Sequence, residues 1–143
     1  MTKKNRALCS SILIVIMLII VAISSRYYKG KSLENNEVLI RESLSRTLAN
    51  IKSFRNSLDS SELESVICEL YLCRVIYPTV NIDNNIEAID LTALMRVISI
   101  LKSNKVDLNG IDDLEKGVQF LVNDIYSVDG FSYFEFFVNK NLN

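Results

Sequence analysis

Residues 7–25 form a run of 19 positions without a charged side chain, bounded by Arg6 and Arg26. As a helix rising about 1.5 Å per residue, this run is about 28 Å long, close to the ~30 Å hydrocarbon core of a membrane. Tyr27 and Tyr28 follow directly, and such amphipathic rings are typical of the membrane interface. The pattern predicts that residues 1–28 are an N-terminal membrane anchor, in which residues 7–25 cross the bilayer as a transmembrane helix.

Two alternatives to a retained anchor stay open for this segment. A secretory signal peptide has a shorter apolar core and small residues before its cleavage site, and Ala22 and Ser24 fit such a site. The domain would then be secreted after signal cleavage. The other alternative is a buried helix of a soluble protein. Basic residues flank both ends of the run, and the α-amine adds one positive charge before it, so we expect a single-pass protein with its domain outside the cell membrane.

The remaining residues, 29–143, show the hydrophobic period of amphipathic helices. Residues 29–32 contain a glycine and are predicted to be a short hinge. Beyond this hinge, apolar positions recur on one side of four predicted helices, at 33–58, 61–77, 84–103 and 112–125. Short polar segments separate these helices, and Pro78 is expected to end the second of them. The expected fold class is therefore all-α, with the N-terminal transmembrane helix followed by a compact antiparallel bundle of four to five helices.

The last segment, residues 131–138, is apolar on every side, so its periodicity fits either a helix or a strand. Aromatic residues favour a strand, but no partner strand is predicted elsewhere, and we therefore predict a short helix. Two roles stay open for its aromatic side chains, which either close the core or form an exposed surface for a protein partner or the bilayer. These side chains are Phe131, Tyr133, Phe134, Phe136 and Phe137.

Charge is spread unevenly along the chain, and its distribution argues against nucleic acid as a partner. The formal net charge is −1, to which residues 1–26 contribute +4, so that the remainder carries −5. Binding to nucleic acid depends largely on Lys and Arg contacts to phosphate. A mildly acidic domain lacks this surplus of positive charge.

Catalytic, cofactor and metal sites are not expected in this chain. Histidine is absent, which removes the commonest general base, the usual nucleophile pairs and most catalytic zinc sites. Cys68 and Cys73 lie five residues apart on one predicted helix, where about 7.5 Å of axial rise separates them and prevents a disulfide. We expect both to be buried thiols that act as small apolar side chains. The sequence therefore predicts a protein that is not an enzyme.

Arg74 and Asp90 are the most informative polar residues of the domain. Arg74 falls within the apolar stripe of the second predicted helix, and Asp90 falls within that of the third. Both lie about one turn from the loop that joins the two helices. A charge in such a position needs a partner, so we predict an ion pair between them that sets the registry of this hairpin. The alternative is a site for an anion or small molecule between the helices.

The leading hypothesis is a non-enzymatic, membrane-anchored helical module that binds another protein of the cell envelope. It depends on the predicted anchor, on the absence of a catalytic constellation and on the aromatic residues of segment 131–138. The alternative function is a ligand-sensing helical bundle with its site near Arg74. An unpaired Arg74 in a concave, partly wet pocket would favour sensing, and a paired Arg74 together with exposed C-terminal aromatic residues would favour partner binding.

Overall fold

The computed structural model describes residues 3–80, 88–103, 106 and 108–142, with their side chains except those of 3–14, 88, 89, 108 and 109. Five α-helices form this described part: α1 (Lys3–Ser57), α2 (Ser60–Val80), α3 (Ala88–Lys102), α4 (Leu108–Asn123) and α5 (Val128–Leu142). The predicted all-α fold is confirmed for these residues. The chain divides into two compact units, Met1–Asn35 and Asn36–Asn143.

The described part of the first unit is the N-terminal part of α1. Among the residues that the structure describes, no helix is both long and apolar enough to cross a membrane. Residues 7–14, which begin the predicted span, lie outside the described side chains. The large apolar side chains from 15 to 23 are between 51 and 63% exposed. The transmembrane anchor therefore stays a prediction.

The predicted hinge at residues 29–32 is wrong, because these residues lie inside α1. A single glycine such as Gly30 costs a helix about 1 kcal/mol relative to alanine and does not end it by itself. The segment contains no proline, so each of its residues keeps the backbone N–H that a helix requires. The helix predicted from residue 33 is therefore continuous with the helical residues before it.

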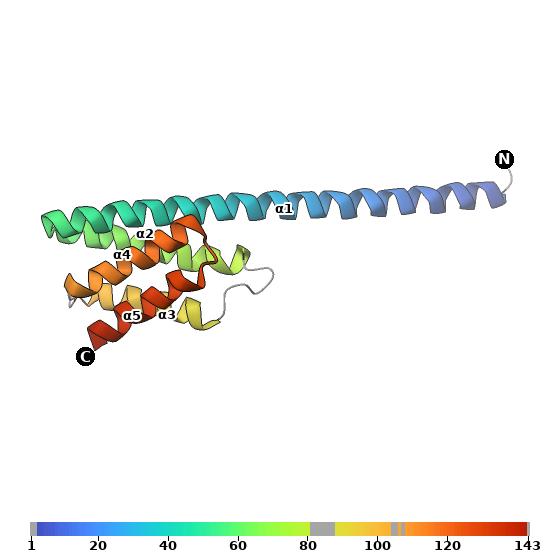
Figure 1. Cartoon of the computed structure of the whole chain (residues 1–143). Coiled ribbons are helices and arrows are strands. Elements are labelled where there is room, and N and C mark those ends of the chain that lie inside the picture. The colour runs from blue at the N-terminus through green and yellow to red at the C-terminus, as the bar shows by residue number, and fades with distance from the viewer. Residues whose placement is uncertain (1–2, 81–87, 104–105, 107, 143) are drawn as a thin grey trace. The chain divides into compact units, whose positions relative to one another are not determined.

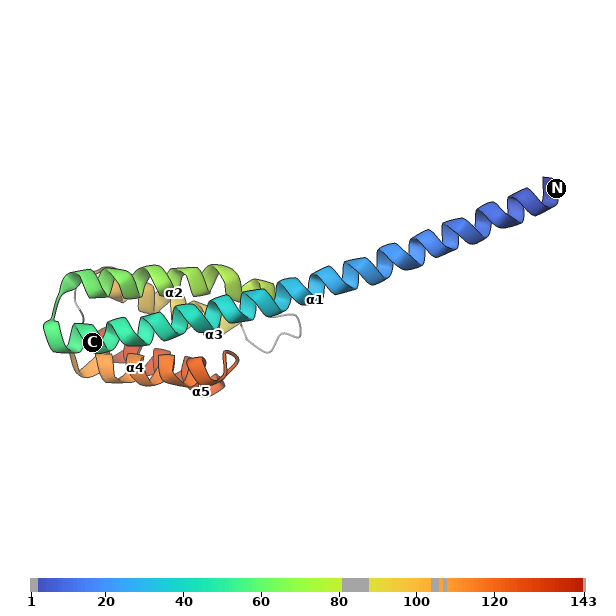
Figure 2. The same ribbon diagram turned by 90° about the horizontal axis from the view of Figure 1, so that it is seen from above.

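In the second unit, α1 from residue 36 onward packs with α2, α3, α4 and α5 in a bundle (Figures 1 and 2). α1 and α2 run antiparallel to each other, and so do α4 and α5 (Figure 1). α3 packs against both α2 and α5. The predicted helical bundle is confirmed. Its largest fully buried side chains include Tyr77, Phe131, Phe134, Phe137, Ile40, Leu44, Ile51, Leu70, Leu94 and Leu101.

α2, α4 and α5 differ in length from the predicted helices, and the predicted start of the third helix at residue 84 lies outside the described residues. α2 continues past Pro78 to Val80, because the proline stands in the last turn and removes only one backbone donor there. α4 begins at Leu108, one turn before its predicted start at Asp112. The segment predicted as a short helix at 131–138 is helical and belongs to the longer α5.

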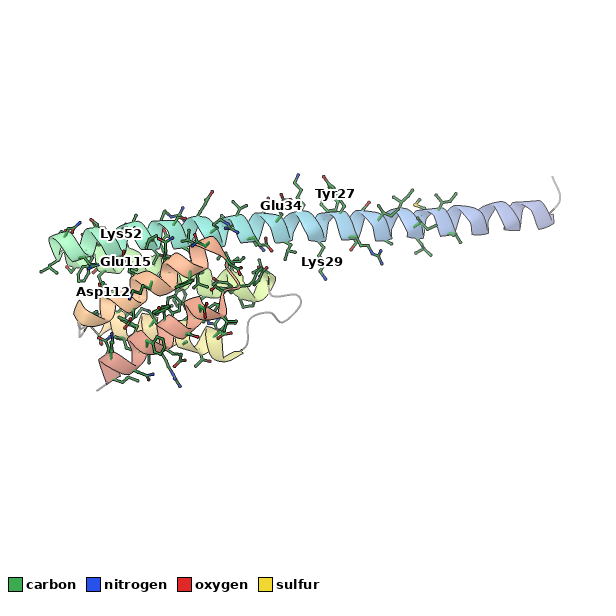
Figure 3. The ribbon with its side chains drawn as sticks, viewed as in Figure 1. Tyr27, Lys29, Glu34, Lys52, Asp112 and Glu115 are labelled. Atoms are coloured by element: carbon green, nitrogen blue, oxygen red, sulfur yellow. The ribbon has the colours of Figure 1, made fainter. Side chains whose placement is uncertain are left out.

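Two arginines of α1 connect the helices at the surface of the bundle. The Arg46 guanidinium donates to both carboxylate oxygens of Glu69 on α2, at 2.6 and 3.1 Å. The hydrogen bond from Arg46 is the main reason why the pKa of Glu69 lies below its ordinary value. Arg55 reaches Glu115 at 2.6 Å and Asp112 at 3.0 Å, both on α4 (Figure 3). Because both arginines are well exposed to water, these ion pairs orient the helices more than they stabilise them.

A third arginine of α1 caps the C-terminal end of α4. Arg41 Nη1 donates to the carbonyl oxygens of Val122 and Asn123, at 3.0 and 3.3 Å. The last carbonyl groups of a helix have no partner inside the helix and carry its negative partial charge. The Arg41 guanidinium donates hydrogen bonds to these carbonyl groups and places a positive charge beside the negative end of the helix. It thereby connects α4 to α1.

The turn between α1 and α2 places Leu58 in a left-handed backbone conformation, with a φ of 55°. Its amide donates to the carbonyl of Phe54 at 2.7 Å, and its side chain is exposed. Asp59 follows, and its carboxylate accepts a hydrogen bond from the amide of Ser61 at 2.9 Å, which caps the start of α2. The left-handed region costs a residue with a Cβ about 1–2 kcal/mol, a cost that glycine avoids.

We predict that Leu58→Gly raises the free energy of unfolding by about 0.5–1 kcal/mol, because the relieved strain exceeds the added backbone entropy of glycine. The measurement is urea unfolding of the full-length chain in mild detergent. Leu58→Val is the matched control and should lower stability, because a β-branched side chain tolerates this backbone conformation least. A glycine variant no more stable than the wild type would contradict the prediction.

Candidate functional site

The aromatic residues near the C-terminus divide between the core and the surface. Phe131, Phe134 and Phe137 repeat every three residues along α5 and are at most 2% exposed. Tyr133 is only partly buried, and Phe136 points outward with 53% of its surface exposed. The segment therefore contributes side chains to the core and others to the surface, because successive residues of a helix point in different directions around its axis. A role of the exposed rings in binding stays a prediction.

A residue that the sequence analysis did not single out, Phe120 of α4, completes the exposed aromatic group. Its ring stacks on that of Tyr133, with centroids 5.6 Å apart and planes 13° apart. The ring of Tyr133 in turn meets Phe136 edge-on, at 5.7 Å and 80°. Phe120, Tyr133 and Phe136 form a continuous aromatic strip across α4 and α5. A large aromatic residue outside the apolar stripe of α4 was the sequence signal that could have revealed it.

Two glycines bring α4 and α5 close enough for this stacking. A Cβ atom on Gly117 would lie 2.8 Å from Cδ1 of Phe134 and 2.9 Å from the carbonyl oxygen of Gly130. A Cβ atom on Gly130 would lie 2.6 Å from Cγ of Leu121 and 3.1 Å from the carbonyl oxygen of Gly117. Both distances to side chains are shorter than van der Waals contact allows. The two helix backbones therefore touch directly at this point, one turn from the aromatic strip.

Charged side chains surround the aromatic strip without covering it. The Lys116 ammonium lies 5.8 Å from the ring centroid of Tyr133, within range of a cation–π contact. Beside Phe136, Lys140 pairs with the largely buried carboxylate of Asp113 at 2.6 Å. This pair and Phe136 line a surface hollow of about 350 Å³. The strip thus has an apolar centre and a polar edge of mixed charge.

The strip presents a mainly apolar, aromatic surface that is suited to binding. Tyr133 contributes its one hydroxyl group, and the chain contains no histidine. Among the described residues, no group of three or more Cys, Asp or Glu side chains could hold a metal ion. Aromatic side chains with a polar rim are the composition typical of protein–protein contact surfaces.

Arg74 and Asp90 occupy different environments. Arg74 is half-buried on α2, and its Nε atom is buried with no hydrogen-bond partner among the described residues. Tyr77, one turn further along, is fully buried, and burial is the main reason why the pKa of its hydroxyl lies well above the ordinary value. Asp90 is half-buried in the first turn of α3, where the helix dipole favours an acid. The predicted ion pair stays a prediction.

The two described cysteines differ in burial. Cys73 is fully buried beside the carbonyl of Ile40, and burial raises the pKa of its thiol to about 12. Cys68 is a free, exposed thiol on the other side of α2. The expectation that both are buried is therefore wrong for Cys68, because α2 is apolar on both sides and only one of them faces the core.

Comparison with known proteins found no relative of this chain. No family model matches the chain, and no curated protein or solved structure matches it either. The functional interpretation therefore rests on the chain's own residues, chiefly on the exposed aromatic strip.

We predict that Gly130→Ala costs about 1–3 kcal/mol of stability, because the added methyl group overlaps Leu121 and the backbone of α4. The free energy lost through this overlap should exceed the ~1 kcal/mol of stability that alanine adds because it is a better helix former than glycine. Urea unfolding of the full-length chain measures it, and near-ultraviolet circular dichroism reports whether the Tyr133 environment changes. The matched control is Gly30→Ala on α1, where nothing lies within 4 Å of the new atom and stability should not fall. Equal behaviour of the two variants would contradict the role of the close contact.

Proposed function

We propose that this chain is a non-enzymatic, membrane-anchored helical module that binds another protein of the cell envelope through its aromatic strip. The observation that carries the proposal is the exposure of the two rings on either side of Tyr133, 40% for Phe120 and 53% for Phe136, on a bundle in which Phe131, Phe134 and Phe137 are buried. Burial of an aromatic side chain stabilises a protein by a few kcal/mol, so exposed rings are retained where a partner covers them.

The shape and chemistry of the strip favour a protein as the partner. Tyr133 is held between two other rings, so little side-chain freedom is lost when a partner covers it. Rigid aromatic residues at the centre of a contact surface commonly contribute most of the binding energy. The mixed charges of Lys116, Lys140 and Asp113 at the edge can select the partner through complementary charges.

The proposed anchor depends on the first unit. Residues 7–25 contain no charge, and the side chains described from 15 to 23 expose apolar surface on all sides of the helix. A helix that is apolar all round is typical of a lipid or protein interior. Tyr27 and Lys29 lie just beyond this segment and point to opposite sides of α1 (Figure 3). Tyrosine rings and basic side chains are both favoured at a membrane interface. We place the bundle outside the cell membrane, with secretion after signal cleavage as the alternative.

A ligand-sensing function near Arg74 is the second candidate, and the buried polar atoms of α2 favour it. Nε of Arg74 and the hydroxyl of Tyr77 are both buried without a hydrogen-bond partner among the described residues. Buried donors are rarely left unsatisfied in proteins, and a bound anion or water molecule is a common partner for such a group.

We predict that millimolar phosphate or sulfate raises the melting temperature of the wild type no more than that of Arg74→Met, relative to chloride at equal ionic strength. Partner binding resides on the aromatic strip, and the general stabilising effect of these anions acts on both chains alike. The measurement is a thermal shift assay across anion concentration, since a ligand of the folded state raises the melting temperature. Arg74→Met is the matched variant. A shift that occurs in the wild type and is lost in Arg74→Met would favour the sensor function over the proposed one.

We predict that a photo-crosslinking amino acid at position 136 captures one protein of defined mass from membranes of the producing cell. Phe120→Ser, introduced in the same chain, should reduce this capture more than about tenfold, because aromatic residues at the centre of an interface commonly contribute over 2 kcal/mol. The readout is the crosslinked band and its identification by mass spectrometry.

The control for this experiment places the crosslinker at Ser45, an exposed position of α1. Circular dichroism of the Phe120→Ser chain checks that the bundle is intact. Capture of the same protein with equal yield from positions 45 and 136, or capture that is indifferent to Phe120→Ser, would overturn the assignment of the strip.

A further inference from the structure

Helix α2 has a second apolar side, which faces away from the core of the bundle. Cys68, Tyr71, Leu72 and Val75 are exposed there, Tyr71 by 50% and Val75 by 57%. The opposite side of the same helix holds the buried Cys73 and its neighbours in the core. A helix that is apolar on both sides is normally covered on both. We refer to the four exposed residues as the α2 stripe.

The spacing of the α2 stripe is that of a coiled-coil seam. Cys68, Tyr71, Val75 and Pro78 follow one another at intervals of three, four and three residues. These are positions a, d, a and d of a heptad repeat, the positions that face a partner helix. Leu72 then occupies position e, which borders the seam.

We propose that the α2 stripe binds the α2 stripe of a second copy of this chain, with the two helices parallel and related by a two-fold axis. The self-association rests on α2 alone and is separate from the aromatic strip. The parallel orientation rests on the proposed function, because it brings the residue-36 ends of both bundles to the same end of the dimer, as two anchors in one membrane require.

A surface hollow beside the α2 stripe accommodates the second copy. The hollow has a volume of about 340 Å³ and is lined by Glu64, Ile67, Cys68 and Lys102. In a parallel coiled coil, the residue at position g contacts the residue at position e of the partner, five positions further along. Ile67 is at position g, so this hollow faces Leu72 of the partner subunit. By symmetry, Leu72 enters the hollow of the partner.

The charges around the α2 stripe allow it to meet a second copy of itself. The four side chains of the stripe are uncharged, so at these positions two copies can meet without placing like charges together. Glu64, one turn before Cys68, lines the same hollow as Lys102, which carries the opposite charge. Lys102 of α3 stands at the side of the stripe, with its ammonium 5.4 Å from the ring centroid of Tyr71. A two-fold contact requires a surface that complements itself, and an uncharged heptad seam does so. Because α2 is already folded within the bundle, the contact need not supply the free energy of helix formation.

Disulfide trapping of Cys68 tests the proposal directly. In the parallel pair, position a places the two Cys68 residues face to face across the axis, within the distance that a disulfide spans. We expect mild oxidation of the full-length chain carrying Cys9→Ser, purified in mild detergent, to give a covalent dimer through Cys68. Cys73 is buried and should not react. Sedimentation velocity of the reduced chain across concentration should show a monomer–dimer equilibrium.

Matched variants separate this contact from other associations. Val75→Glu and Leu72→Glu should each reduce the disulfide-linked dimer at least tenfold, while circular dichroism stays unchanged because both side chains are exposed. Phe120→Glu is the matched control, because Phe120 and Leu72 are both 40% exposed but lie on different helices. This variant should leave the dimer intact. A reduced chain that is monomeric at all concentrations, or a dimer that withstands both α2 variants, would overturn the proposal.

The orientation has its own test. An antiparallel pair centred on the seam packs position a against position d of the partner, so Cys68 would face position 78 of the partner and the two Cys68 residues would lie about 15 Å apart along the axis. Crosslinking that requires Pro78→Cys together with Cys68 would therefore overturn the parallel pair. Carbonate washing of membranes reports separately whether the chain is anchored, so that a failed anchor is not mistaken for a failed dimer.

Discussion

The direct contact between the backbones of α4 and α5 is the constraint on which the functional surface depends. Gly117 and Gly130 leave no room for a Cβ atom on either helix. With the helices this close, Phe120 of α4 reaches Tyr133 of α5 and the aromatic strip becomes continuous. The same closeness packs Phe134 against Gly117 in the core. One contact therefore organises both the interior of the α4–α5 pair and its exposed surface.

Helix α2 shows how one element can serve two surfaces. Its buried side, which includes Tyr77 and Cys73, completes the core of the bundle, and Arg46 of α1 holds its middle through Glu69. Its other side carries the exposed α2 stripe. The two proposed contacts, the aromatic strip for an envelope protein and the α2 stripe for a second copy, lie on different helices.

Much of the fold could be predicted from the sequence, because an amphipathic helix repeats its apolar residues about every 3.6 positions. The apolar positions of α3 and α4, such as Leu94, Val97, Leu114 and Val118, are buried as their spacing predicts. The errors lie where a local signal is weak. Gly30 suggested a hinge inside a continuous helix, and Pro78 suggested an end two residues too early, because one unfavourable residue seldom outweighs its neighbours.

The sequence by itself determined that the domain is mainly helical and that it lacks histidine, but for residues 131–138 its periodicity fitted either a helix or a strand. Only the tertiary structure decided which of these residues meet Phe120, and that Cys68 faces outward while Cys73 lies in the core. The physical reason is that hydrophobic periodicity records which side of a helix is apolar. It does not record how closely two helices approach, or which of two apolar sides the bundle covers.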